Sequence, residues 1–172
     1  METTKDKMKS AQDSYLTFKL GEENFALHVN NVLNILEMTE ITKIPKTPEY
    51  LKGVINLRGS VLPVIDTRLK LDMTETEITQ NTCIVVIDLE LNGEKIYFGS
   101  IVDQVEAVHQ IPDDKIQPVP ELSNNLNTRF LKGLTYLDDQ FILILDIVKL
   151  LSDEDMSNIS EIYTEQKENQ EE

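Results

Sequence analysis

Short apolar runs, each interrupted by turn-forming residues, recur along most of the chain. SYLTFKL stops at Gly21 and FALHV resumes after Asn24, while CIVVIDLEL stops at Asn92-Gly93 before KIYFGSIV. Two further pairs of runs enclose the polar turns Arg58-Gly59-Ser60 and Asp138-Asp139-Gln140. Runs of this length and spacing predict β-hairpins, and many of them in succession favour a barrel or sandwich over alternating strands and helices.

The second half of this pattern repeats the first. Residues 50–71 align with residues 130–151 at a fixed offset of 80, and FALHVNNV aligns with FGSIVDQV at an offset of 73. The identical positions of the longer match are Leu51, Lys52, Gly53, Leu57, Asp66 and Leu71 with Leu131, Lys132, Gly133, Leu137, Asp146 and Leu151. A duplicated unit of about five strands is therefore expected, and a small closed barrel would remove its exposed edges.

Some positions within each unit carry a more specific expectation. HVNNVLNI and IVDQVEAV are interpreted as short helical or irregular links between hairpins. Gly53 and Gly133, each after a lysine, are expected to supply turn conformations that a residue with a Cβ resists. Pro63 is expected on an edge strand or at a bulge, because proline cannot donate a hydrogen bond to a neighbouring strand.

The two ends of the chain differ from the body. Residues 1–13 are expected to be disordered and contain no apolar stretch of the kind that a secretory signal needs. Ser152, followed three residues later by Asp155, predicts a helix start, and Met156, Ile159 and Ile162 or Tyr163 follow at helical spacing. Beyond Tyr163 the polar composition predicts disorder.

The expected organisation therefore has three parts. They are the N-terminus 1–13, one domain at 14–152 with barrel subdomains near 14–80 and 81–152, and an acidic C-terminal helix and tail at 153–172.

The charge distribution narrows the range of partners. The chain has 31 acidic and 16 basic side chains, a net charge of −15, so most of its surface repels nucleic acid and anionic membrane. Residues 152–172 hold eight acids and one lysine. By contrast, residues 43–70 carry Lys43, Lys46, Lys52, Arg58, Arg68 and Lys70 against two acids, a local balance of +4. This basic segment is a candidate docking surface for an acidic partner, unless its charges lie on different faces.

Candidate chemistry is sparse. The glycines form no phosphate-binding GxG pattern, and His28, His109 and Cys83 lack neighbours at metal-ligand or catalytic spacing. No cofactor, metal ion or enzymatic activity is therefore expected, although carboxylates that only the fold brings together stay open. The single cysteine fits a reducing cytoplasm, and the longest apolar run, FILIL, is too short for direct membrane insertion.

The motifs, taken together, resemble a known family. YLTFKLGEENFALHVNNVLNIL, ITKIPKTPEYLKGVINLRGSVLPVIDTRLKL, CIVVIDL, IVDQVEAV and FLKGLTYLDDQFILILDIVKLL cover nearly all of residues 14–152. They are similar to the CheW-type chemotaxis coupling proteins, most specifically from Ile44 to Asp66. The resemblance implies a mainly β fold of two intertwined five-stranded SH3-like β-barrels, which agrees with the internal duplication, with short helices and a C-terminal helix.

The same resemblance implies a function. Such proteins are non-catalytic adaptors that couple the cytoplasmic tips of methyl-accepting chemoreceptors to the regulatory domain of a CheA-type histidine kinase. This chain would then be cytoplasmic and recruited to receptor arrays at the inner face of the membrane.

Seven positions correspond to the family's contact regions. The receptor-binding region falls on Val32, Asn34, Gly53 and Arg58, and the kinase-binding strand ends of the second barrel fall on Thr82, Gly99 and Val102. Many members carry a glutamate at the Asn34 position, so an ion pair between that position and Arg58 is absent from this chain.

Three alternatives remain from the sequence. A CheW-like scaffold of another chemosensory array would carry the same signature. A nucleic-acid-binding barrel needs aromatic residues among basic ones, but the chain has no Trp and only Tyr50 in its basic segment. A small-molecule-binding barrel would require an internal cavity.

Overall fold

The computed structural model describes residues 13–91, 93–120 and 128–170, with the backbone alone for residues 163–170. Its strands are β1 (Ser14–Leu20), β2 (Glu23–His28), β3 (Val32–Glu37), β4 (Leu51–Leu57), β5 (Ser60–Asp66), β6 (Cys83–Leu91), β7 (Glu94–Val102), β8 (Gln104–Gln110), β9 (Leu131–Leu137) and β10 (Gln140–Leu145). The helices are η1 (Val29–Asn31), α2 (Thr67–Lys70), η2 (Asp113–Lys115), η3 (Thr128–Phe130), α3 (Ile147–Leu150) and α4 (Asp153–Gln170). Residues 1–12, where disorder is expected, lie outside the described part.

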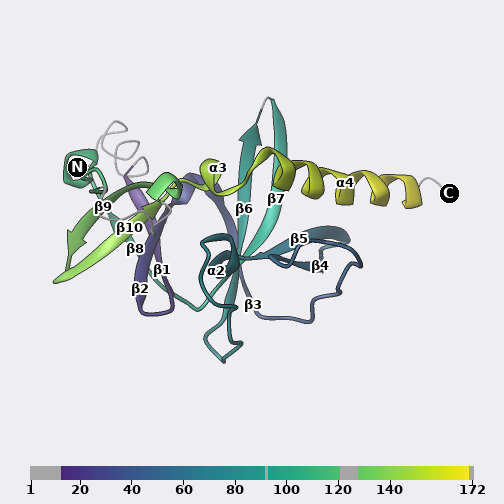
Figure 1. Cartoon of the computed structure of the whole chain (residues 1–172), viewed down its shortest axis with the longest axis horizontal. Helices are drawn as coiled ribbons and strands as arrows, with labels where there is room; N and C mark the ends of the chain where they lie inside the picture. The colour runs from purple at the N-terminus through teal and green to yellow at the C-terminus, as the bar shows by residue number, and fades with distance from the viewer. Residues whose placement is uncertain (1–12, 92, 121–127, 171–172) are drawn as a thin grey trace, which may run out of the picture.

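The strands form two five-stranded sheets that exchange their hairpins. Sheet A has the order β8-β1-β2-β10-β9, and sheet B has the order β3-β6-β7-β5-β4. The β1–β2 hairpin of the first repeat thus lies in the sheet of the second, and the β6–β7 hairpin lies in the sheet of the first (Figure 1). The intertwined arrangement is confirmed. Strand pairing across the repeats, rather than chain order, defines each sheet.

The duplication is visible in the pairing register. In sheet B, Val64 of β5 pairs in parallel with Gly99 of β7. In sheet A, Ile144 of β10 pairs in parallel with Ala26 of β2, so the same two offsets of 80 and 73 relate the two pairs. The helices α2 and α3 follow at equivalent positions, and the two repeats therefore share one backbone plan.

The edges of the sheets are joined by single bridges rather than by a continuous ladder. Within the described residues, no strand pairing links β3 to β4 or β8 to β9. Instead, Thr42 bridges Val54 of β4, and Gln117 bridges Leu134 of β9. The expected fully closed barrel is therefore corrected to a nearly closed one, because the chain beyond each edge strand bends over and meets the opposite edge at one point.

These bridges explain why both repeats have a glycine after the lysine of the LKG sequence. The two glycines, Gly53 and Gly133, lie in strands and not in turns. A Cβ on Gly53 would lie 2.0 Å from the Thr42 carbonyl oxygen, and its φ is 141°. A Cβ on Gly133 would lie 2.6 Å from Ile116 Cγ2 and 2.7 Å from the Gln117 carbonyl oxygen. Both glycines permit the close backbone approach that completes the barrel.

Two other local expectations also change. The first of the two links that were expected to be helical or irregular does contain a short helix, η1, but strands β3 and β8 follow, because VLNILE and QVEAVHQ alternate with the period of a strand. Pro63 lies in β5, which is an interior strand between β7 and β4. The pairing of β5 with β7 begins only at Val64, so the missing N–H of Pro63 interrupts no pair on that side.

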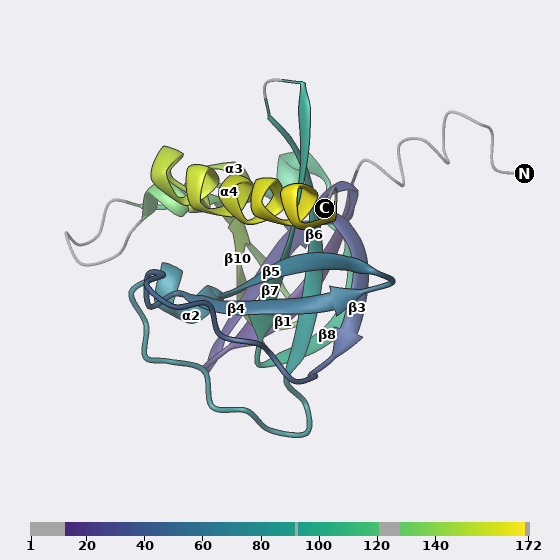
Figure 2. The same ribbon diagram turned by 90° about the vertical axis from the view of Figure 1, so that its right-hand side faces the viewer.

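The helix α4 begins as the sequence predicts. The Asp155 amide donates to Ser152 Oγ (3.1 Å), and the Ser152 amide donates to Asp155 Oδ2 (2.9 Å), which is a reciprocal capping arrangement. Ile159 and Ile162 are buried and Met156 packs against the same core. The helix runs beside β5 (Figure 2) and continues to Gln170, past Tyr163, where disorder is predicted; its Glu, Gln and Lys residues favour helix.

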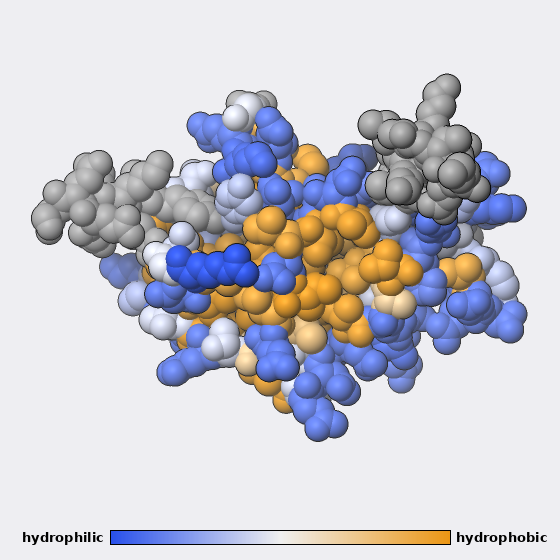
Figure 3. All heavy atoms as spheres, turned by 180° about the vertical axis from the view of Figure 1, so that it is seen from behind, coloured by the Kyte–Doolittle hydropathy of each residue, from blue (hydrophilic) through white to orange (hydrophobic). Residues whose placement is uncertain are grey.

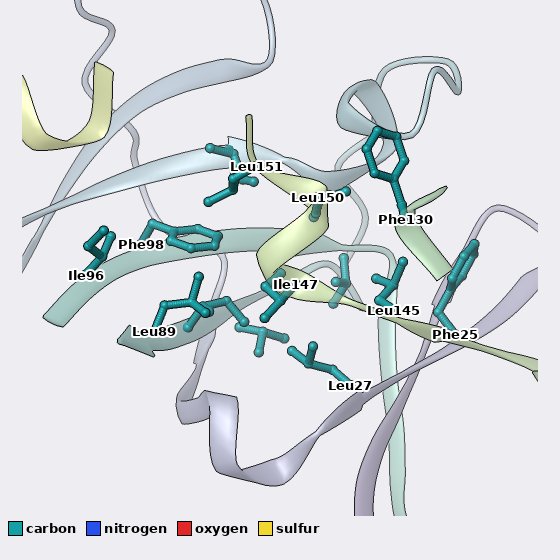
Figure 4. Packing of buried hydrophobic residues seen from close by; sticks show 14 of the residues in the cluster. Phe25, Leu27, Leu89, Ile96, Phe98, Phe130, Leu145, Ile147, Leu150 and Leu151 are labelled. Carbon is teal, nitrogen blue, oxygen red and sulfur yellow. The ribbon is translucent and has the colours of Figure 1, made fainter. Parts of the chain in front are cut away.

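The largest core lies between the two sheets. It joins Phe25 and Leu27 of sheet A to Leu89 and Phe98 of sheet B, and the short helix α3 inserts Ile147 and Leu150 between them (Figure 4). A smaller cluster fills each sheet's own concave side: Ile55, Leu62, Val64, Ile84, Val86 and Ile101 in sheet B, and Tyr15, Ala26, Ile111, Ile142 and Ile144 in and near sheet A. Side chains therefore occupy the space where a small-molecule-binding barrel would need its cavity.

Candidate partner-binding surfaces

Strand β3 carries the first two predicted receptor-binding residues. Val32 and Asn34 are both half-buried, and the pairing of β3 with β6 shifts register between them. The Asn34 side chain accepts a hydrogen bond from the Ile35 amide (2.8 Å). Asn34 is therefore held locally, and its amide stands where a glutamate would place a charge.

The sequence interpretation missed the outward-facing residues of the same strand. Leu33 is 55% exposed and Ile35 is 41% exposed. They follow β-strand alternation, so the signal was present in VLNILE, but the segment was interpreted as a link. Exposed aliphatic side chains on an edge strand can contact an apolar partner. Figure 3 shows that apolar side chains gather across the middle of one face of the molecule.

Arg58 lies at the tip of the β4–β5 hairpin. Arg58 and Gly59 both have positive φ, 53° and 83°, as a two-residue turn of this kind requires, and the Gly59 amide donates to Asn56 Oδ1 (2.9 Å). The Arg58 side chain is exposed, and no acid in the described part of the chain pairs with it. Its guanidinium is thus available for a carboxylate of a partner.

Gly53, the remaining predicted receptor-binding residue, is buried in β4 beneath Thr42. The structure therefore gives it a framework role and offers no surface at this position. A substitution there would disturb β4 and, through it, the hairpin that carries Arg58.

The predicted kinase-binding residues lie in the same sheet as the predicted receptor-binding residues. Gly99 and Val102 belong to β7, and Thr82 directly precedes β6, so all three belong to sheet B or border it. The exchange of the β6–β7 hairpin places them there. All three are buried.

Each of these buried positions has a structural partner. The Thr82 hydroxyl accepts from the Thr79 amide (2.8 Å), a Cβ on Gly99 would lie 2.7 Å from Ile84 Cγ2, and Val102 is 1% exposed. Direct contact with a partner would therefore use their neighbours. A surface cavity of about 500 Å³ lies beside Thr82, with Glu37, Gln80 and Gln104 among its lining residues.

The basic segment divides into paired and free cations. Lys52 pairs with Glu75, Arg68 with Asp103, and Lys70 with Asp155. Lys43, Lys46 and Arg58 are exposed and have no ion pair among the described residues. The local positive balance therefore reduces to three cations that can face a partner.

Two of the paired cations, Arg68 and Lys70, connect separate parts of the fold. Arg68 contacts both carboxylate oxygens of Asp103, with 3.0 Å from Nε to Oδ1, and Asp103 Oδ2 also accepts from the Gly21 amide (2.5 Å) in the β1–β2 turn. Lys70 Nζ lies 2.5 Å from Asp155 and 4.5 Å from the centre of the Tyr50 ring. These contacts tie α2 to sheet A and to α4.

Burial raises the pKa of the Tyr50 hydroxyl well above its ordinary value, and the Asp155 carboxylate adds to the effect. For Asp155, burial opposes ionisation, but the hydrogen bonds from Lys70 and the Ser152 amide, together with the nearby Tyr50 hydroxyl, outweigh it and lower the pKa. The ionised form of Asp155 is therefore part of the folded structure.

The described part of the chain contains neither a candidate metal site nor a candidate membrane-spanning helix. No group of three or more His, Cys, Asp and Glu side chains there is arranged to hold a metal ion. None of its helices has the length and apolar composition that a membrane crossing requires.

Comparison with known proteins gives the family. The sequence matches the CheW-like domain over residues 14–155. The chain belongs to the CheW-like domain family. Chemotaxis protein CheW of Klebsiella aerogenes is 34% identical over 148 residues, 86% of this chain and 87% of its own. Chemotaxis protein CheW of Thermotoga maritima is 29% identical over 153 residues, 89% of this chain and 95% of its own.

A solved CheW structure confirms the fold. The scaffolding protein TtCheW from Thermoanaerobacter tengcongensis superposes with a TM-score of 0.72 at 32% identity, covering 84% of this chain and 90% of that one. The expected mainly β, SH3-like, CheW-like architecture is therefore confirmed, as is the expected resemblance to chemotaxis coupling proteins.

Proposed function

We propose that this protein is a non-catalytic chemotaxis adaptor that couples the cytoplasmic tips of chemoreceptors to the regulatory domain of a CheA-type histidine kinase. The observation that carries this proposal is the CheW-like match over residues 14–155, supported by a solved relative described as a scaffolding protein. The adaptor unit spans residues 14–152, with α4 attached, and acts in the cytoplasm at receptor arrays. It needs no cofactor or metal ion.

The receptor contact uses the surface of sheet B around β3 and the β4–β5 turn. Leu33 and Ile35 supply exposed apolar area beside the half-buried Val32 and Asn34, and Arg58 supplies a free cation. Apolar area contributes affinity, while a charge at the margin contributes orientation and association rate. Gly53 supports this surface from beneath.

The kinase contact uses the neighbourhood of Thr82, Gly99 and Val102. Because these three residues are buried, they shape the ends of β6 and β7, and the exposed residues of the adjacent cavity contact the kinase. Kinase control then arises as a coupling free energy between two binding sites on one small protein.

The test is charge reversal at Arg58. Purified protein, receptor signalling fragment and CheA-type kinase are mixed, and each pairwise affinity is measured by titration calorimetry. We expect Arg58→Glu to weaken receptor binding about tenfold, since an interfacial charge pair is typically worth 1 to 3 kcal/mol, and to change kinase binding less than twofold. The control is Lys115→Glu, which reverses an exposed charge in η2, outside sheet B.

Two results would contradict the proposal. One is the absence of a ternary complex when each partner is competent with a characterised coupling protein. The other is an equal loss of receptor and kinase binding in Arg58→Glu, which would show that Arg58 does not act specifically in the receptor contact. A scaffold for another chemosensory array would bind receptors and kinase of that array in the same assay.

A further inference from the structure

The two repeats form equivalent pockets next to their short helices. One, here named the Lys52 pocket, has a volume of about 340 Å³ and is lined by Lys52, Asp66, Glu75, Thr76 and Ile101, among others. The other, the Lys132 pocket, has a volume of about 380 Å³ and is lined by Lys132, Asp146, Tyr15, His28, Asn30 and Asn31, among others. Lys132 and Asp146 are Lys52 and Asp66 at the offset of 80, and His28 and Ile101 match at the offset of 73.

The Lys52 pocket is completed by an extended segment of the chain itself. The Glu75 carboxylate pairs with Lys52, and the adjacent Thr76 gives two hydrogen bonds to Asp66, from its amide (3.0 Å) and its hydroxyl (2.8 Å). Lys52 lowers the pKa of Glu75 through this hydrogen bond. An acidic residue, Glu75, therefore supplies the counter-charge of Lys52, and the threonine that follows it supplies hydrogen-bond donors to Asp66.

The Lys132 pocket has the lysine and the aspartate but lacks this segment in the described part of the chain. After α3 the chain passes directly into α4, and Asp155, the equivalent of Glu75 at the offset of 80, pairs with Lys70 instead. Lys132 is exposed and contacts the Tyr15 hydroxyl at 3.4 Å, with no carboxylate of the described residues paired to it.

Asp146, the aspartate of the Lys132 pocket, accepts fewer hydrogen bonds than Asp66, its equivalent in the Lys52 pocket. Asp66 is fully buried and accepts from the amides of Arg68, Leu69 and Thr76 and from the Thr76 hydroxyl. Asp146 is half-buried and accepts from the Lys149 amide (3.3 Å), and no described residue takes the place of Thr76. Carboxylate oxygens have room for several donors, so Asp146 keeps acceptor capacity toward the pocket.

We infer that the Lys132 pocket binds an extended peptide segment of a partner protein in which an acidic residue is followed by threonine or serine. The acid pairs with Lys132, and the amide and hydroxyl of the next residue donate to Asp146. The Glu75-Thr76 segment is the internal example of this ligand. Asn30 and Asn31, at the rim, offer amide groups for the peptide backbone.

The site is separate from the surfaces assigned above to the receptor and the kinase. Its residues come from β1, β2, η1, β9, β10 and α3, whereas the seven predicted contact residues lie in sheet B or directly before it. The commitment to a partner's segment rests on charge: a cation and an acceptor with spare capacity face an open pocket on an otherwise acidic protein.

The probe is an acetylated and amidated peptide with the sequence of residues 72–79, DMTETEIT, titrated into the full chain and followed by amide NMR shifts. We expect a dissociation constant of about 0.1 to 1 mM, with shifts at His28, Asn30 and Ile147. A peptide carrying Glu75→Gln and Thr76→Ala should bind at least about tenfold more weakly, because it loses the charge-assisted contact and a hydroxyl donor.

Three matched protein variants locate the peptide. Lys132→Gln should weaken binding about tenfold, while Lys149→Gln, a nearby exposed lysine on α3 that does not line the pocket, should leave it unchanged. Lys52→Gln should also leave it unchanged. Loss of binding in Lys52→Gln with retention in Lys132→Gln would overturn the proposal. The peptide would then be displacing residues 72–79 of the chain from the Lys52 pocket. Absence of binding to the full chain would overturn it as well.

Removal of residues 1–12 distinguishes the source of the natural ligand. An unchanged affinity for the peptide supports a partner's segment as the occupant. An affinity that rises tenfold would show that the chain's own N-terminal residues compete for the pocket, and the assignment to a partner would fall.

Discussion

The two repeats place an acidic residue at the same distance after their short helices, yet the two acids have different partners. Glu75 follows α2 and pairs with Lys52 of its own repeat. Asp155, 80 residues later, follows α3 and pairs with Lys70 of the other repeat. The Glu75 side chain is 60% exposed and the Asp155 side chain is 7% exposed. The first pair closes a surface loop, whereas the second fixes α4 across the molecule.

The hairpin turns of the two repeats also have the same backbone conformation but different side chains. Arg58-Gly59 and Asp138-Asp139 share the two positive φ values of one turn type, but one turn is basic and the other acidic. Beside the acidic turn, Tyr136 and Phe141 form an exposed ring pair with centroids 4.9 Å apart. Duplication preserved the backbone plan while the surfaces diverged, and divergent surfaces on equivalent frames would let one protein bind the two different partners proposed above.

The largest expected difference between the repeats is at the two buried glycines. Gly53→Ala should destabilise the fold by about 4 kcal/mol, because its Cβ would lie 2.0 Å from a backbone oxygen at a φ of 141°. Gly133→Ala should cost about 2 kcal/mol, because part of its clash is with the Ile116 side chain, which can shift. Urea unfolding of both variants measures the difference, and equal costs would show that the two closures are equivalent.

The next effect concerns α4, which follows only the second repeat. Removal of Ser160–Glu172 takes away Ile162, which is only 7% exposed and lies in the main core. We expect this truncation to cost about 2 kcal/mol, the value of burying one isoleucine side chain. Removal of Thr164–Glu172 keeps Ile162 and should cost less than about 0.5 kcal/mol. Similar urea midpoints for the two truncated chains would contradict the packing of Ile162.

A smaller effect separates the two acid–lysine pairs. Asp155→Asn should destabilise the protein by about 2 kcal/mol, because it leaves the ammonium of Lys70, whose side chain is only 14% exposed, without its counter-charge. Glu75→Gln should change stability far less, since its carboxylate is exposed to solvent. The double variant Lys70→Met with Asp155→Asn is the control. It should recover part of the loss if the unpaired charge is the cause, and a further loss would point to packing instead.

Local signals in the sequence predicted much of the frame. Gly21, Gly59 and the Asp138-Asp139 pair mark hairpin turns because the required positive φ restricts the residue types there. The capping residues Ser152 and Asp155 likewise fixed the start of α4. The exchange of hairpins could not be predicted in this way, because it depends on parallel pairing between β2 and β10, more than a hundred residues apart, which no local pattern encodes.

The predicted partner-contact residues also divide into those that a local sequence signal indicates and those that it does not. Arg58 was recognisable because a charged residue in a tight turn is exposed. Gly99 and Val102 are buried, and their apolar surroundings give no sequence signal that separates a framework role from contact. Leu33 and Ile35 were missed because a short, Asn-rich segment hides a strand period of two. In each case burial, which depends on the neighbouring strands, decides the role.

The smallest expected effect is the pH dependence of the two pairs. The folded-state pKa of Asp155 lies below its unfolded value of about 3.9, so its contribution to stability is complete above that value and is lost as pH falls through the folded-state pKa. The stability difference between the wild type and Asp155→Asn should therefore be constant from about pH 7 to 5 and shrink below about pH 4.

The comparison with Glu75 sharpens this test. Its pKa is also lowered, but its pair is exposed, so added salt should screen it while leaving the Lys70–Asp155 pair largely intact. Urea unfolding at several pH values, with and without about 0.5 M NaCl, measures both. A difference between the wild type and Asp155→Asn that persists unchanged to pH 2 would show that the protonated carboxyl group holds α4 as well as the carboxylate does, through hydrogen bonds rather than through its charge.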